Sequence, residues 1–136
     1  MTISLQYTNI TVNDVDESIA FYSGALGLDV QNDVASGDHR WVTLGSAAQP
    51  GLGIVISEPH AGRSQADGDA LQELLTKGVL PMLVFRSDDV DATFETVRAS
   101  GAEVLQEPID QAWGPRDCAF RDPSGNMVRI SQAPPA

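Results

Sequence analysis

Few side chains in this 136-residue sequence could act as nucleophiles, general bases or metal ligands. There is one cysteine, Cys118, and there are two histidines, His39 and His60. Both histidines lie in segments rich in glycine and polar residues, so we expect them to be exposed in loops without partners. The sequence contains neither a Gly-x-Ser-x-Gly elbow nor a glycine-rich phosphate loop. We therefore predict no catalytic residue.

Other side chains are better suited to binding than to catalysis. Trp41 and Trp113 lie in segments predicted as strand or loop, and an indole that stacks on a flat ligand gains about 1 kcal/mol beyond its area burial. Either tryptophan could instead fill the core or a subunit interface. Asp117 and Arg129 could form a polar pair, and Tyr7 could donate a hydrogen bond. These three could serve as acid–base groups, and anchoring a ligand suits them equally well.

The composition excludes some classes of partner. Nineteen acidic residues outnumber eight basic ones, which gives a net charge of −11 and disfavours nucleic acid and anionic membranes. No apolar run approaches the roughly 20 residues that span a bilayer, and the N-terminus does not resemble a signal peptide. A single cysteine fits a reducing compartment. We expect a cytoplasmic protein that binds a small molecule or another protein.

The elements that must position these side chains come as two copies of one pattern. Asp14-Val15-Asp16 recurs as Asp89-Val90-Asp91, and each copy is followed by apolar residues at helical spacing. The first aspartate of each copy stands where a helix N-cap is expected. Gly27 and Gly101 then stand at the expected helix ends, where a left-handed residue is favoured.

Short segments with alternating apolar residues surround both helices and predict strands. Each half therefore reads as strand, helix and three strands, an α+β fold of two βαβββ modules within a single domain spanning 1–136. We expect the modules at 1–58 and 79–132, with a first strand over Ile3–Val12 and a linker with a short helix at 59–78. Asp69 is the expected N-cap of that helix, and Leu71, Leu74 and Leu75 form its apolar stripe.

With a helix on one face of each sheet, the other face is free to line a concave, mixed-sheet cup. Alternation along the strands assigns side chains to the two faces. Cys118 falls on the helix-facing side, as a small apolar residue of the core. The predicted ligand-binding residues are ten side chains on the open side, with Trp113 added from a loop: Tyr7, Asn9, Trp41, Thr43, Val55, Ser57, Met82, Val84, Trp113, Asp117 and Arg129.

Three motifs make the chain resemble the vicinal oxygen chelate superfamily, which includes glyoxalase I, extradiol dioxygenases and bleomycin-resistance proteins. They are the Tyr-Thr-Asn-Ile-Thr-Val-Asn-Asp run at 7–14, Phe21-Tyr22 followed by Leu26-Gly27-Leu28, and Asp-Pro-Ser-Gly-Asn at 122–126. With the repeat, the resemblance covers essentially the whole chain. It implies the glyoxalase/bleomycin resistance fold and a homodimer in which each cup is closed by both subunits or by exchanged modules.

In metal-dependent relatives, four inward positions carry His, Gln or Glu. The resemblance places them on Tyr7, Val55, Met82 and Arg129. Valine offers no donor, methionine a soft thioether and arginine a fixed positive charge, while one phenol does not make a site. We therefore predict no metal and no cofactor.

Three hypotheses follow. The leading one is a metal-independent protein that sequesters a hydrophobic or aromatic small molecule, such as an antibiotic or another natural product. The alternative is an enzyme of the superfamily, a glyoxalase-type lyase or a dioxygenase-like protein, with an atypical or metal-free active site. The third is a non-catalytic subunit or regulator that binds another protein. Metal analysis and the state of the cup distinguish them.

Overall fold

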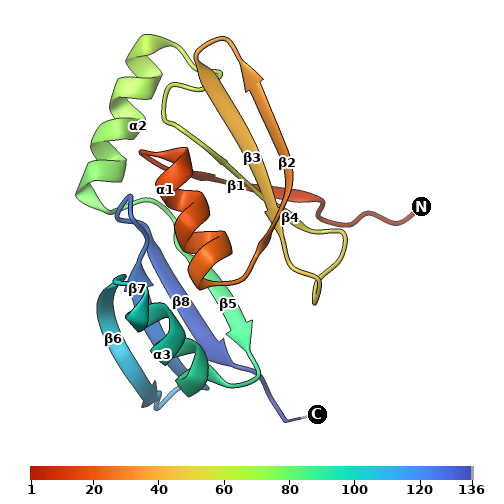
Figure 1. Ribbon diagram of the computed structural model, residues 1–136, viewed down its shortest axis with the longest axis vertical. Coiled ribbons are helices and arrows are strands. Elements are labelled where there is room, and N and C mark those ends of the chain that lie inside the picture. The colour runs from red at the N-terminus through yellow and green to blue at the C-terminus, as the bar shows by residue number, and fades with distance from the viewer. Residues whose placement is uncertain (136) are drawn as a thin grey trace.

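The computed structural model describes residues 1–135 and has the predicted α+β architecture (Figure 1). The first half contains β1 (Tyr7–Thr11), α1 (Val15–Ile19), its continuation η1 (Ala20–Ala25), β2 (Asp29–Ser36), β3 (His39–Gly45) and β4 (Gly53–Ser57). After α2 (Gln65–Lys77), the second half repeats the order with β5 (Leu83–Ser87), α3 (Val90–Ala99), β6 (Glu103–Asp110), β7 (Arg116–Arg121) and β8 (Met127–Gln132).

The two halves build separate four-stranded sheets with the same topology. Their strand orders are β1-β4-β3-β2 and β5-β8-β7-β6. In each sheet the first strand pairs in parallel with the last, and the other pairs are antiparallel. The predicted duplication of a βαβββ module is confirmed, and Figure 1 shows the two sheets one above the other with α2 beside them.

The predicted caps position the first helix of each module. An Asp14 carboxylate oxygen accepts a hydrogen bond from the Glu17 amide at 2.9 Å, and Asp89 accepts one from Ala92 at 3.0 Å. These bonds satisfy amides of the first helical turn that have no partner within the helix. The predicted N-caps are therefore confirmed in both modules.

An ion pair also connects the first helix of each module to its sheet. At the start of β3, Arg40 Nη1 lies 2.7 Å from Asp16 Oδ1, and at the start of β7, Arg116 Nη2 lies 2.8 Å from Asp91 Oδ1. Because Asp16 and Asp91 occupy matching places in the first helical turn, the two modules contain the same strand-to-helix ion pair.

Two elements differ from their predicted bounds. The first strand begins at Tyr7 rather than Ile3, and Ile3 and Leu5 are exposed. Helix α2 begins at Gln65 with Ser64 as its N-cap, so the prediction that Asp69 caps it was wrong. Gly68 lies inside its first turns, a place that usually weakens a helix. Here a Cβ would lie 2.1 Å from Cδ2 of the His60 ring, so glycine makes room for that ring.

A turn at 122–126 in the second module makes hydrogen bonds to the first module. The buried Asp122 carboxylate accepts a hydrogen bond from the Tyr22 hydroxyl at 2.7 Å. Burial raises the pKa of Tyr22, and the Asp122 charge adds to that effect. From the same turn, Asn126 Nδ2 donates to the Thr11 carbonyl at 2.8 Å, and Ser124 Oγ accepts from the Asn13 amide at 2.8 Å.

The apolar core lies between each helix and its sheet, as alternation predicts. Val42, Leu44, Cys118 and Phe120 are fully buried, and Phe94 of α3 stacks on Phe120 with ring centroids 5.3 Å apart. Among residues 1–135, no helix is long and apolar enough to cross a membrane.

Cys118 is expected to be chemically inert while the protein is folded. Burial raises the pKa of its thiol to about 11, so little reactive thiolate forms at neutral pH. Alkylation by iodoacetamide at pH 8 should be at least about a hundredfold slower in native protein than in urea-unfolded protein. Mass spectrometry of timed samples measures both rates, and equal rates would contradict the buried position.

Candidate ligand-binding faces

The open face of the first sheet is aromatic and nearly free of charge. The Tyr7 ring lies over Gly53, since a Cβ there would be 2.9 Å from Tyr7 Cδ1 and 2.8 Å from Thr43 Cγ2. Tyr7 remains 51% exposed. Farther along β3, Trp41 is half-buried, and a Cβ at Gly62 would lie 3.7 Å from its Cζ2. Glycine at position 53 thus makes room for the Tyr7 ring against the sheet.

Replacing Gly53 by alanine should displace the Tyr7 ring and destabilise the protein by about 1–3 kcal/mol, the usual range for an overpacked site. Thermal unfolding measures the loss. Gly114→Ala is the matched control, because nothing lies within 4 Å of a Cβ there. Equal stability of the two variants would show that the Tyr7 ring does not depend on Gly53.

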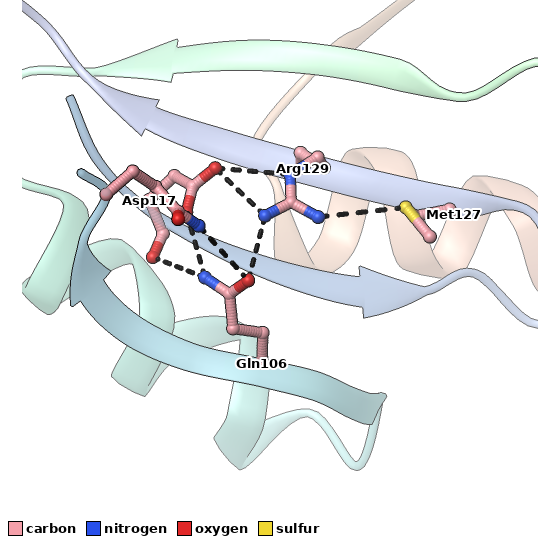
Figure 2. A network of polar contacts seen from close by, with 5 residues as sticks. Gln106, Asp117, Met127 and Arg129 are labelled. Atoms are coloured by element: carbon pink, nitrogen blue, oxygen red, sulfur yellow. Dashed lines mark hydrogen bonds and ion pairs between the residues drawn. The ribbon is translucent and has the colours of Figure 1, made fainter. Parts of the chain in front are cut away.

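The open face of the second sheet carries a polar network on β6, β7 and β8 (Figure 2). Nε and Nη2 of Arg129 donate to Asp117 Oδ2 at 3.1 and 3.0 Å, and Nη2 also donates to Gln106 Oε1 at 2.9 Å. The other Asp117 oxygen accepts from Gln106 at 2.8 Å and from Gln111 at 2.9 Å. We call these four side chains the Arg129 network. The Asp117 side chain is 2% exposed and that of Arg129 20%.

The network keeps Asp117 ionised despite its burial. Burial alone would raise the pKa of this carboxyl, but hydrogen bonds from Gln111, Gln106 and Arg129 together with the Arg129 charge outweigh it. The pKa of Asp117 therefore lies below its ordinary value. A charged pair held in this way can orient a donor toward a ligand.

The predicted residues belong to the two sheets and to one loop, and they do not surround either of the two cavities described below. Met82 and Val84 are 49% and 59% exposed, and Trp113 is 73% exposed. Asn9 is also exposed, whereas Ser57 is buried. Two surface cavities, of about 530 and 160 Å³, lie elsewhere, and of the predicted residues Asn9 alone lines one of them.

The histidines differ from the prediction of exposed side chains without partners. His60 Nε2 lies 2.8 Å from Asp69 Oδ1, so this histidine does have a partner. His39 is the first residue of β3 and is half-buried, and its Nδ1 has no hydrogen-bond partner among residues 1–135. The loop-like sequence context of His60 concealed its placement, because its partner Asp69 lies on the helix that begins five residues later.

The side chains at the four inward positions do not fit a metal ion. Val55 has no donor atom, Met82 has a thioether, and the Arg129 guanidinium brings a fixed positive charge. Tyr7 alone could supply an oxygen ligand. Within the described part of the chain, no group of three or more His, Cys, Asp or Glu side chains could hold a metal ion.

Sequence reasoning missed two members of the Arg129 network. Gln106 lies on β6, where the pairing with β7 shifts register on both sides of it, so simple alternation does not assign its face. Gln111 follows the end of β6 and has no periodic pattern around it. The predicted partners Asp117 and Arg129 could have pointed to neutral donors nearby, because a buried carboxylate requires several hydrogen bonds.

Comparisons with known proteins agree with this architecture. UcmS2 has a solved structure that matches with a TM-score of 0.86 and 30% identity, covering 98% of this chain and 100% of that one. TnmS3, an antibiotic binding protein from Streptomyces sp. CB03234, matches with a TM-score of 0.76 and 25% identity over 98% and 99%. A probable lactoylglutathione lyase from Vibrio cholerae is 25% identical over 93% of this chain and 88% of its own length.

A match to a protein-family model shows which family the chain shares with these similar proteins. The model of the Glyoxalase/Bleomycin resistance protein/Dioxygenase superfamily matches residues 4–130, which include every strand and helix except the end of β8. Together with the duplicated βαβββ topology, this match means that the chain belongs to the Glyoxalase/Bleomycin resistance protein/Dioxygenase superfamily.

Proposed function

We propose that this protein binds and sequesters a hydrophobic, aromatic small molecule, such as an antibiotic or another natural product, without a metal. The observation that carries the proposal is the set of side chains at the four inward positions. Three of them, Tyr7, Val55 and Met82, are aromatic or apolar, and the fourth, Arg129, is tied to a buried carboxylate. An apolar surface with a few fixed polar groups is the usual composition of a small-molecule site.

Similarity to TnmS3 supports the same function, because that protein is an antibiotic binding protein with the same fold over nearly the whole chain. Sequestration requires no turnover. A protein present in excess over its ligand protects by stoichiometric capture if the Kd is low.

The proposal includes a homodimer that completes each site. Tyr7, Met82 and Val84 are apolar or aromatic and about half exposed, and they lie on or beside β1 and β5, which are edge strands of the two sheets. Exposed edge strands with apolar side chains favour pairing with another chain. Sedimentation equilibrium should give twice the chain mass, and a monomer at all concentrations would contradict this part of the proposal.

The experiment that tests the function is a titration with a panel of flat aromatic antibiotics, followed by tryptophan fluorescence and thermal midpoint. At least one compound should quench the fluorescence and raise the midpoint with 1:1 stoichiometry per chain. Trp41→Leu should weaken its binding by about tenfold, the loss of roughly 1.4 kcal/mol of stacking and contact. Leu74→Ala, an exposed residue of α2 outside the predicted ligand-binding set, is the control and should bind normally. Failure of every compound to bind, or equal binding by both variants, would contradict the proposal.

The alternative is an enzyme with metal-dependent lyase or dioxygenase chemistry. A measurement of the metal content distinguishes it from metal-free sequestration. Protein purified without chelator should contain substoichiometric Zn, Ni, Mn and Fe, and adding these ions should leave the thermal midpoint unchanged. A stoichiometric metal that stabilises the fold would favour the enzyme.

A further inference from the structure

The Arg129 guanidinium has an edge that no strong acceptor occupies. Its Nε and Nη2 are engaged by Asp117 and Gln106. For Nη1, the partner within residues 1–135 is Met127 Sδ at 3.9 Å, and a thioether is a weak acceptor (Figure 2). The N–H groups of Nη1 therefore point to a place where an acceptor oxygen from outside the chain would be stabilised.

The direction of that edge is fixed. Asp117 holds the guanidinium through two of its nitrogens, and Gln106 and Gln111 hold Asp117 in turn. Gln106 also donates to the Asp117 backbone carbonyl at 3.1 Å. A donor held by such a network loses little conformational freedom when a ligand binds, so its hydrogen bond adds more to affinity.

The network is close to neutral as a whole. The Asp117 carboxylate lies within 3.0 Å of the guanidinium and balances its charge, and the remaining members are uncharged amides. A ligand carboxylate beside Nη1 would also meet the negative charge of Asp117. This arrangement favours a neutral oxygen acceptor over an anion.

The matching positions of the first module carry aromatic and apolar side chains instead. Where β7 and β8 carry Asp117 and Arg129, β3 and β4 carry Trp41 and Val55. One sheet thus offers an aromatic, apolar face and the other an oriented donor, and the homodimer proposed above is what completes a site from the two.

We infer that the ligand is an aromatic molecule with a neutral carbonyl oxygen at its edge, which accepts a hydrogen bond from Nη1 of Arg129. This inference rests on the proposed function and narrows it to one chemical class.

Three probes of similar size test it: 2-acetylnaphthalene, 2-ethylnaphthalene and 2-naphthoate, each titrated into the full-length protein by ligand-observed NMR. The ketone should bind about tenfold more tightly than the hydrocarbon, as expected for one hydrogen bond from a charged donor, and at least as tightly as the carboxylate. Arg129→Lys keeps a charge beside Asp117 but loses the planar guanidinium, so it should abolish the preference for the ketone over the hydrocarbon. Arg98→Lys on α3 is the matched control and should preserve the difference.

Each result separates this inference from the broader proposal. Equal affinities of ketone and hydrocarbon, or equal losses of both in Arg129→Lys, overturn the carbonyl inference and leave aromatic binding intact. Tighter binding of naphthoate also overturns it, because the site would then prefer an anion. Absence of binding by all three probes also overturns the carbonyl inference, whereas failure of the whole antibiotic panel is what overturns the proposed function. If Arg129→Lys does not fold, the Nε–Hε NMR signal of Arg129 in the unmodified protein should shift with the ketone and not with the hydrocarbon, and no shift with the ketone overturns the inference.

Discussion

Replacing Arg129 by methionine is expected to lower the free energy of unfolding by roughly 3 kcal/mol, because it leaves a buried carboxylate without its counter-charge. Asp117 is 2% exposed and would retain only the amide donors of Gln106 and Gln111. Urea denaturation of both proteins at pH 7 measures the difference.

Two further variants show whether the loss of stability comes from the unpaired charge of Asp117. The double variant Asp117→Asn with Arg129→Met should recover part of the stability, since the buried group is then neutral. Arg40→Met should cost much less, because Arg40 pairs with exposed aspartates in solvent. Equal losses for Arg129→Met and Arg40→Met would argue against a special role for burial at Asp117.

The pH dependence follows from the same carboxyl. Because the pKa of Asp117 is lowered by folding, its contribution is fully present above the unfolded pKa of about 3.9 and is lost as the pH falls through the folded value. Arg129→Met removes one cause of the lowering, so the part of the acid-induced loss that Asp117 contributes should be smaller in the variant. Unfolding curves between about pH 2 and 7 test this direction.

The second large effect is expected at the contact between the modules. Tyr22→Phe should destabilise the protein by about 2 kcal/mol, because it removes a hydrogen bond to the buried Asp122 carboxylate. The ring itself stays, so packing changes little. Thermal unfolding and urea denaturation measure the loss.

Tyr7→Phe is the matched control for stability. The Tyr7 hydroxyl has no hydrogen-bond partner in the described range 1–135, and the side chain is half exposed. Its removal should change the free energy of unfolding by less than about 0.5 kcal/mol. A loss at Tyr22 no larger than at Tyr7 would mean that the hydroxyl of Tyr22 does not stabilise the native state.

Much of the fold was predictable because it is encoded locally and encoded twice. The aspartates at 14 and 89 cap helices through side chains that act within one turn. Alternation placed Val42 and Cys118 in the core because strand side chains change face at every residue. Local signals of this kind require no knowledge of the rest of the chain.

The candidate site was less predictable because it depends on distant segments and irregular strands. Asp117 and Arg129 could be paired from their registers in neighbouring strands, whereas Gln106 reaches them from a strand whose pairing shifts. The bond from Tyr22 to Asp122 joins positions far apart in the sequence, and neither residue has a local pattern that would predict it.

The ion pairs Arg40–Asp16 and Arg116–Asp91 occupy matching positions in the two modules, so they show which residues of the two halves correspond. At positions where the two modules agree, the capping aspartates satisfy amides of the first helical turn and these ion pairs hold the helix to the sheet. Positions at which they diverged, Trp41 against Asp117 and Val55 against Arg129, lie on the open faces. At these positions one module carries an indole and an aliphatic side chain and the other an ion pair, and transplanting Asp117 and Arg129 onto positions 41 and 55 would be a direct way to make the two faces alike.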